Sequence, residues 1–117
     1  MRSPKAQRAY KRHLKKIPAH IPCEFCDINP SYPQFIRETK SFKIFTNIFP
    51  YSTWDSMHTA DHLLVIPKKH IDKLADLTAT EAVEFLDIIG SYEVQGYNIY
   101  ARAPQTAVKS IVHQHTH

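Results

Sequence analysis

The last five residues, His113-Gln-His-Thr-His117, place three histidines at alternate positions. Side chains on a strand alternate between its two faces, so the pattern predicts three imidazoles on one face, roughly 6 to 7 Å apart. An imidazole titrates near neutrality and acts as a nucleophile, a proton carrier or a metal ligand, depending on which nitrogen is free. The alternative is a histidine-rich end without function, but the alternation with Gln and Thr differs from a purification tag of consecutive histidines.

Two apolar segments upstream of the histidines read as strands. In residues 41–48, Phe42 and Ile44 would lie on one face of a strand and Phe45 on the other. Apolar residues on both faces predict a largely buried strand at the centre of a sheet. The second segment, His62-Leu-Leu-Val-Ile-Pro67, ends at a proline. Residues 97–101 and 109–117 are expected to form two more strands.

One helix is predicted between these pairs of strands. Thr78-Ala-Thr-Glu81 matches a capping box. The apolar residues that follow keep the i, i+3, i+4, i+7 spacing of an amphipathic helix: Ala82, Phe85, Leu86 and Ile89. Gly90 could end this helix, and Gly96 is the surer stop. The order of strands and helix predicts an antiparallel α+β domain.

Length and composition favour one soluble globular domain. The chain has 117 residues, of which 43% are hydrophobic, 22% charged and 11% aromatic. No apolar run approaches the roughly 20 residues of a membrane-spanning helix, and no apolar signal segment follows the basic N-terminus. We therefore expect no membrane span and a cytoplasmic location.

The positive charge is concentrated in an N-terminal extension, residues 1–20. This extension holds seven of the 15 cations and none of the 11 acids, so the remainder of the chain is net negative. The cations are Arg2, Lys5, Arg8, Lys11, Arg12, Lys15 and Lys16. Such an arm could bind nucleic acid or an anionic surface by counterion release, or be a solvated tail with a short helix over residues 5–16.

Cys23-Glu-Phe-Cys26 spaces two thiols as for one tetrahedral metal ion. Zinc favours Cys and His ligands in closed structural sites. His70, after a strand, and His113 are credible third and fourth ligands, because such a zinc would tie an N-terminal knuckle to two distant segments. A buried reduced pair and a redox dithiol are the alternatives.

These motifs together resemble the histidine triad (HIT) hydrolases and transferases, in particular their zinc-binding branch related to the Hint proteins. The resemblance rests on the Cys-x-x-Cys motif, Phe45-Thr-Asn-Ile-Phe-Pro50, residues 62–71 and the final histidines, in this order. It covers residues 21–117 and implies a HIT-like domain with an antiparallel sheet of about five strands, one main amphipathic helix and a short N-terminal helix. It also implies a homodimer whose two sheets join edge to edge.

The resemblance implies hydrolysis or transfer at the α-phosphorus of a purine nucleotide derivative. By position His115 is the nucleophile, forming a nucleotidyl-imidazole that water resolves. His117 and His62 match positions that line the phosphate, and Ser110 matches the hydroxyl near the leaving group. The zinc-binding branch implies a structural Zn²⁺ on Cys23, Cys26, His70 and His113.

The substrate-binding positions show departures from the family. The resemblance assigns substrate contacts to Phe45, to Asn47, where the family usually keeps an Asp for the ribose, and to Asn98. The segment before the triad lacks the usual glycines, and Arg102 or Lys109 could supply charge-assisted phosphate contacts instead. About five extra residues lengthen the loop over residues 53–60. Its Trp54 and the nearby Tyr51 could shape a base pocket, but we expect them to cover the core.

Two other functions fit the same residues. A zinc-stabilised nucleotide- or RNA-binding module that has lost catalysis is compatible with the missing glycines. A catalytic metal held directly by the histidines is also possible, because His-x-His on a strand can chelate. The leading hypothesis remains a HIT-type hydrolase of nucleoside phosphoramidates, nucleotidyl anhydrides or dinucleoside polyphosphates.

Overall fold

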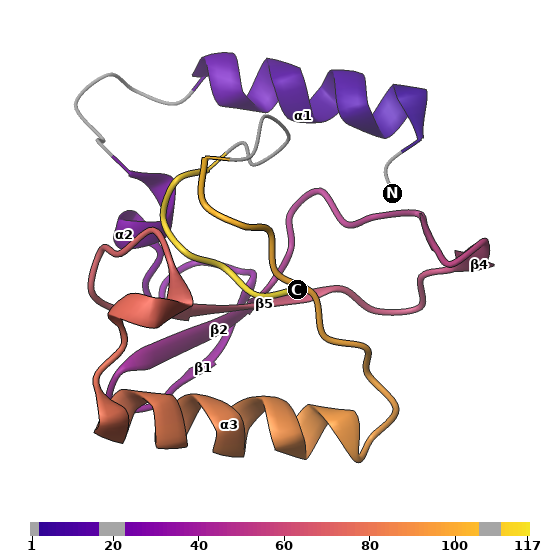
Figure 1. The fold of residues 1–117 in the computed structure, drawn as a ribbon. Helices are drawn as coiled ribbons and strands as arrows, with labels where there is room; N and C mark the ends of the chain where they lie inside the picture. Colours follow the sequence, from indigo (N-terminus) through magenta and orange to yellow (C-terminus); the bar gives the residue numbers. More distant parts are fainter. Residues whose placement is uncertain (1–2, 17–22, 106–110) are drawn as a thin grey trace.

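A three-stranded antiparallel sheet forms the centre of the protein (Figure 1). The computed structural model describes residues 3–16, 23–105 and 111–117. Its elements are, in chain order, α1 (Pro4–Lys16), α2 (Glu24–Asp27), β1 (Phe35–Glu38), β2 (Phe42–Thr46), β3 (Thr53–Trp54), β4 (Met57–His58), β5 (Leu63–Pro67), the 3-10 helix η1 (Leu74–Asp76) and α3 (Ala79–Glu93). The expected α+β class with one main helix is confirmed.

Strand β2 lies between β1 and β5, as its two-sided apolar pattern predicts. Phe42 and Ile44 face one apolar cluster, where they pack with Val65, Phe85 and Ile88. Phe45 faces a second cluster on the other side of the sheet. That second cluster consists of Phe25, Ile28, Phe45, Leu64 and Ile66. Each face of the sheet thus has its own core.

Helix α3 covers the first of these faces and begins where the sequence predicts. The Thr78 side chain accepts from the Glu81 N–H and the Glu81 carboxylate accepts from the Thr78 N–H, which completes the capping box. Gly90 lies inside the helix. Gly96, with φ of +96°, follows the helix end and is the stop, because this conformation strains other residues.

Residues 111–117 lie beside β5, and residues 97–101 lie beside residues 111–117, but the two segments do not form the continuous strands expected. Within the described residues they make only two isolated bridges, Val65 with Thr116 and Ala101 with Thr116. Pro67 has no N–H and cannot extend the β5 ladder, and its carbonyl bonds instead to Nε2 of the His113 ring at 2.8 Å. Counted with these two segments, the sheet has the five members predicted. Only three of them, β1, β2 and β5, are continuous strands within the described residues, which is fewer than predicted.

The extra loop residues form a hairpin of β3 and β4 that projects from the sheet (Figure 1). Its turn residues Asp55 and Ser56 both have positive φ, as a tight two-residue turn requires. The sequence did not predict this hairpin, because its turn contains no glycine.

The predicted short N-terminal helix is present as α1 and lies on the side of the molecule opposite to α3 (Figure 1). No helix among the described residues is long and apolar enough to cross a membrane.

Candidate functional site

His115 is held in a defined orientation at the centre of the C-terminal segment. Its Nδ1 lies 2.9 Å from the carbonyl oxygen of His113. A carbonyl only accepts, so Nδ1 carries the proton and the neutral ring has its lone pair on Nε2. The ring packs edge-on against Phe25, with centroids 5.1 Å apart, and the side chain is 7% exposed. This is the tautomer that a nucleophilic imidazole needs.

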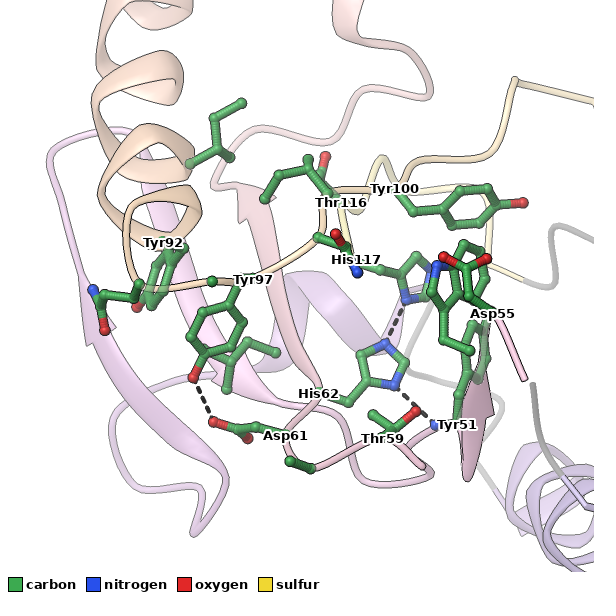
Figure 2. A pocket seen from close by; sticks show the side chains of 18 of the residues that line it. Tyr51, Asp55, Thr59, Asp61, His62, Tyr92, Tyr97, Tyr100, Thr116 and His117 are labelled. Atoms are coloured by element: carbon green, nitrogen blue, oxygen red, sulfur yellow. Dashed lines mark hydrogen bonds between the residues drawn. The ribbon is translucent and has the colours of Figure 1, made fainter. Parts of the chain in front are cut away.

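A second chain of hydrogen bonds joins Tyr51, His62 and His117 (Figure 2). The Tyr51 N–H donates to His62 Nδ1 at 2.9 Å, so His62 carries its proton on Nε2. That Nε2 lies 2.7 Å from His117 Nδ1, to which it donates. The neutral His117 ring therefore carries its own proton on Nε2, as a hydrogen-bond donor. Its centroid lies 5.1 Å from that of His115.

A cavity of about 500 Å³ opens beside this chain (Figure 2). His62 and His117 line it, together with the aromatic rings of Tyr51, Trp54 and Tyr100. The Tyr51 ring stacks on His117 with centroids 5.2 Å apart. His115 does not belong to the cavity lining, although its ring contacts that of His117. The cavity thus gives a ligand access to two of the three histidines predicted to act in the reaction.

Tyr97 and Asp61 close one side of the cavity by a hydrogen bond of 2.6 Å (Figure 2). This bond, with a smaller contribution from desolvation, raises the pKa of the Tyr97 hydroxyl. The hydroxyl therefore stays protonated through the neutral range.

The predicted substrate-binding residues lie at different distances from this cavity. Asn98 lines it. Asn47 is adjacent in the fold, since its N–H donates to the His62 carbonyl at 2.9 Å, while its side-chain oxygen accepts from the Phe49 N–H. Arg102 donates to the Tyr51 hydroxyl at 3.3 Å, and its guanidinium lies 5.3 Å from the Tyr100 ring.

Phe45 lies in the core rather than at the cavity. It is 1% exposed and packs edge-on against Phe25, the residue that supports His115. Its contact with the site is therefore indirect in this structure. Ser110 and Lys109 lie outside the described residues.

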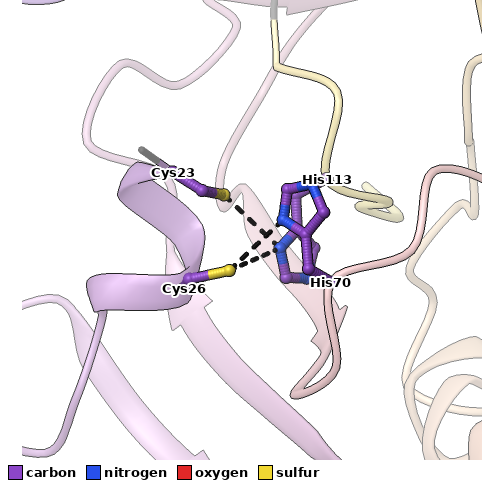
Figure 3. Close-up of side chains that lie close together, drawn as sticks. All are labelled: Cys23, Cys26, His70 and His113. Carbon is purple, nitrogen blue, oxygen red and sulfur yellow. Dashed lines mark hydrogen bonds between the residues drawn. The ribbon is translucent and has the colours of Figure 1, made fainter. Parts of the chain in front are cut away.

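Cys23, Cys26, His70 and His113 gather at one point, although they come from three distant parts of the chain (Figure 3). Their ligand atoms all lie within 4.8 Å of one another. The Cys26 Sγ lies 3.3 Å from Nδ1 of both His70 and His113, and the Cys23 Sγ lies 3.5 Å from Nδ1 of His113. This Cys₂His₂ cluster could bind a metal ion.

Three sulfur–nitrogen separations in the cluster fit a tetrahedral ion. With Zn–S near 2.3 Å and Zn–N near 2.05 Å, tetrahedral angles separate sulfur and nitrogen by about 3.6 Å. The measured separations of 3.3 and 3.5 Å are close to that value. His113 Nε2 donates to the Pro67 carbonyl, which leaves the Nδ1 lone pair facing the thiols. A carbonyl in this position is the usual partner of a metal-binding histidine.

Lys43 on β2 supports the knuckle that carries the two cysteines. Its ammonium donates to the Ile28 carbonyl at 2.6 Å and to the Cys26 carbonyl at 3.3 Å. Desolvation and the neighbouring Cys23 thiol raise the pKa of Cys26, and the positive charge of Lys43 opposes this. Lys43 therefore favours the thiolate form that metal ions bind.

Sequence reasoning missed part of this site. Tyr51 is buried at 7% exposure, as expected, yet Tyr51 and Trp54 also line the cavity. Phe25 packs on His115, a contact that the Cys-x-x-Cys motif does not indicate. Tyr100 also lines the cavity. The sequence signal that could have indicated this is its place in a predicted strand next to the histidine segment.

Comparison with known proteins agrees with this fold. A family model described as HIT domain matches residues 29–117. No curated protein matches the chain significantly.

Several solved structures are similar to this one. A hypothetical protein from Leishmania major is 28% identical, with a TM-score of 0.60, over 82% of this chain and 70% of that chain. A member of the HIT family from Bacillus subtilis is 25% identical, with a TM-score of 0.58, over 82% of this chain and 70% of that one. A HIT family hydrolase from Legionella pneumophila Philadelphia 1 is 24% identical, with a TM-score of 0.58, over 81% of this chain and 88% of that chain. At this identity the similarity supports the fold alone.

The matched residues 29–117 make up most of the chain and include the three C-terminal histidines together with His62. The chain therefore belongs to the HIT domain family.

Proposed function

We propose that the protein hydrolyses a purine nucleotide derivative at its α-phosphorus. Nucleoside phosphoramidates, nucleotidyl anhydrides and dinucleoside polyphosphates are the substrate class. The single observation that carries the proposal is the bond between His115 Nδ1 and the His113 carbonyl, which leaves the lone pair on Nε2. A neutral imidazole in this tautomer is a competent nucleophile.

In the proposed first step, His115 Nε2 forms a bond to the α-phosphorus while the bond from phosphorus to the leaving group breaks. The leaving group departs with the electron pair of that bond and takes up a proton. Water then attacks the nucleotidyl-imidazole, releases the nucleoside monophosphate and returns His115 to its neutral form. Ser110 is proposed to donate a hydrogen bond to the leaving group, which takes its proton from solvent, and the attacking water returns a proton to solvent.

The other histidines act on the phosphate in this proposal. His117 presents its Nε2 proton as a donor to the phosphoryl oxygens, where negative charge accumulates. His62 holds His117 in that tautomer through the 2.7 Å bond. Arg102, near Tyr51 and Tyr100, and Lys109 supply positive charge in place of the absent glycine-rich backbone.

The nucleoside is proposed to lie between Asn47 and Asn98. Asn98 lines the cavity, and Asn47 is bonded to the backbone of His62. Asn47 can accept from a ribose hydroxyl through its amide oxygen, as the usual Asp does. Phe45 would act through the packing of Phe25 behind His115.

We propose that the Cys₂His₂ cluster holds a structural Zn²⁺, as in the zinc-binding branch related to the Hint proteins. The donor set and the nearly tetrahedral spacing support a closed four-ligand site. When bound, the ion ties α2 to the end of β5 and to the C-terminal segment, and so fixes the backbone that carries His115.

We also propose a homodimer. On the outer side of α3, Val83, Leu86 and Val94 are 61%, 62% and 87% exposed. At 100° per residue they lie on one side of the helix and its C-cap and form an apolar stripe, which the exposed Asp87 interrupts. A second copy of this chain would cover that stripe.

A nucleotide-binding protein without catalysis is the second candidate. The specific observation in its favour is that the cavity reaches His62 and His117 but not His115. Such a protein would bind nucleotide and release no product.

The test is product release from a panel of nucleoside phosphoramidates and dinucleoside polyphosphates. We expect wild-type protein to release AMP or GMP, and His115→Ala to reduce turnover by at least about 10³-fold, because no nucleophile remains. Zinc content and melting temperature should stay near wild type, since His115 is not a ligand of the cluster. Nucleotide binding without turnover in wild-type protein would instead identify the second candidate.

A further inference from the structure

Four cations form a continuous stripe along α1. Lys5, Arg8, Lys11 and Arg12 are all exposed. At 100° per residue these positions span an arc of about 120° on one side of the helix. Helix α1 has no acidic residue, so nothing within the helix neutralises this cationic stripe.

The opposite side of α1 is fixed to the body of the protein. Tyr10 is 6% exposed, and its ring lies 5.6 Å from that of Phe49, in the loop after β2. Ala6, which lies on the same side as Tyr10, is partly buried. The Ser3 hydroxyl accepts from the Ala6 N–H and caps the first turn. The helix is thus formed and oriented with its cationic stripe toward solvent.

Some cations elsewhere in the described structure have carboxylate partners. Lys68 pairs with Glu38, Lys69 with Glu81 and Lys73 with Asp72 and Asp76. Within the described residues, no carboxylate pairs with any member of the cationic stripe. The stripe is therefore charge that the fold itself leaves uncompensated.

We propose that the cationic stripe binds the phosphate backbone of a nucleic acid. Along a helix, the distance from Lys5 to Arg12 is about 10 Å. Phosphates follow one another at about 3.4 Å of rise along one strand, so the stripe spans roughly three of them. Charge complementarity selects this polyanion, and the contact is separate from hydrolysis at the histidines.

The composition of residues 3–12 argues against a membrane surface as the partner. An interfacial helix buries an apolar face in the lipid headgroups. Between residues 3 and 12, the only large apolar side chain is Tyr10, which is already buried against the body. Exposed aromatic rings that could stack on bases are absent from residues 3–12. The proposed contact is therefore with the phosphate backbone of the nucleic acid and is independent of base sequence.

Fluorescence anisotropy with a labelled single-stranded RNA and with a DNA duplex of the same sequence tests this proposal. The full chain is titrated at several sodium chloride concentrations between about 50 and 200 mM. The test variant replaces the four stripe residues with Gln, which keeps helix propensity: Lys5→Gln, Arg8→Gln, Lys11→Gln and Arg12→Gln. A control variant removes four cations from the body: Arg37→Gln, Lys40→Gln, Lys68→Gln and Lys73→Gln.

For wild-type and control protein we expect a slope of log K against log salt of about −2 to −3, from three contacts. The test variant should bind at least roughly tenfold more weakly, with a slope near zero. The relative affinities for RNA and duplex identify which nucleic acid the stripe prefers. Equal binding by wild-type protein and the test variant would overturn the proposal. So would sedimentation with phosphatidylserine vesicles in the absence of oligonucleotide binding, which would assign the stripe to a lipid surface.

Discussion

His62 donates to His117 across 2.7 Å, and the direction of this bond is set by the Tyr51 backbone. Because the Tyr51 N–H occupies Nδ1 of His62, the proton of His62 can lie only on Nε2. His117 must then accept at Nδ1 and present a proton at Nε2. The backbone of a loop thus determines the protonation state of a ring that lines the cavity.

This chain of bonds predicts the effect of changing His62. His62→Ala removes the donor to His117, so its tautomer is no longer fixed, and we expect turnover to fall by about 10²-fold. His62→Gln can place an amide N–H near the original Nε2 position and should recover part of the loss. Steady-state kinetics of both variants checks this. Equal losses in the two variants would show that His62 does not act through its donor.

Metal binding should stabilise the fold. We expect one zinc ion per chain by elemental analysis, and loss of that ion in Cys26→Ser. Binding to the folded state alone adds about 3 kcal/mol when free zinc exceeds its Kd a hundredfold. Chelation should therefore lower the melting temperature of wild-type protein and leave that of Cys26→Ser unchanged. Persistence of stoichiometric zinc in Cys26→Ser would contradict the assigned ligand set.

Lys43 should affect the metal site without being a ligand. Its ammonium holds the Cys26 and Ile28 carbonyls at 3.3 and 2.6 Å. Lys43→Met keeps the apolar stem and removes these bonds, and we expect zinc affinity to fall about tenfold, as for other residues that orient ligands. Competition titration with a chromophoric chelator measures this. The exposed control Lys73→Met should bind zinc as wild type does, and an equal loss in both variants would exclude the positioning role.

Glu84 should make stability depend on pH. Desolvation raises the pKa of its carboxyl, but hydrogen bonds from the Thr39 hydroxyl and the Ser41 N–H outweigh this and place it below the ordinary 4.5. A pKa lowered by folding contributes stability above the unfolded-state value, and this contribution disappears as pH falls through the folded-state pKa.

We therefore expect Glu84→Gln to lower the free energy of unfolding by about 1 kcal/mol near pH 7. The difference from wild type should shrink as pH falls below 4.5. Urea unfolding at several pH values measures it, with exposed Glu93→Gln as the matched control. A difference that stays constant from pH 7 to pH 3 would contradict the assignment.

Much of the fold follows from local patterns in the sequence. The alternation of Phe42 and Ile44 with Phe45 predicts a strand that is buried on both faces. This strand, β2, is the central strand of the sheet and contributes to both apolar clusters. The capping box at Thr78 predicts the start of α3. These predictions succeed because each depends on residues close in sequence.

One wrong prediction depends on a contact between distant residues, and another on an uncommon local turn. The ladder beside β5 is interrupted because the Pro67 carbonyl pairs with the His113 ring, a contact across 46 positions that no local pattern contains. The β3–β4 hairpin uses Asp55 and Ser56 at positive φ, which propensity alone does not predict.

The candidate site shows the same division. The spacing of Cys23 and Cys26 predicts a shared metal site, and the structure brings them together with His70 and His113. The support of His115 by Phe25 and the aromatic lining from Tyr100 arise from tertiary packing, so sequence reasoning did not find them.

The most direct test of the central claim is to identify the covalent intermediate. Wild-type protein is mixed with excess nucleoside phosphoramidate, quenched in alkali within one turnover and mapped by peptide mass spectrometry. We expect a nucleotidyl adduct on His115 that is absent from His115→Ala. An adduct on His117, or product formed at the wild-type rate by His115→Ala, would contradict the assignment of His115 as the nucleophile.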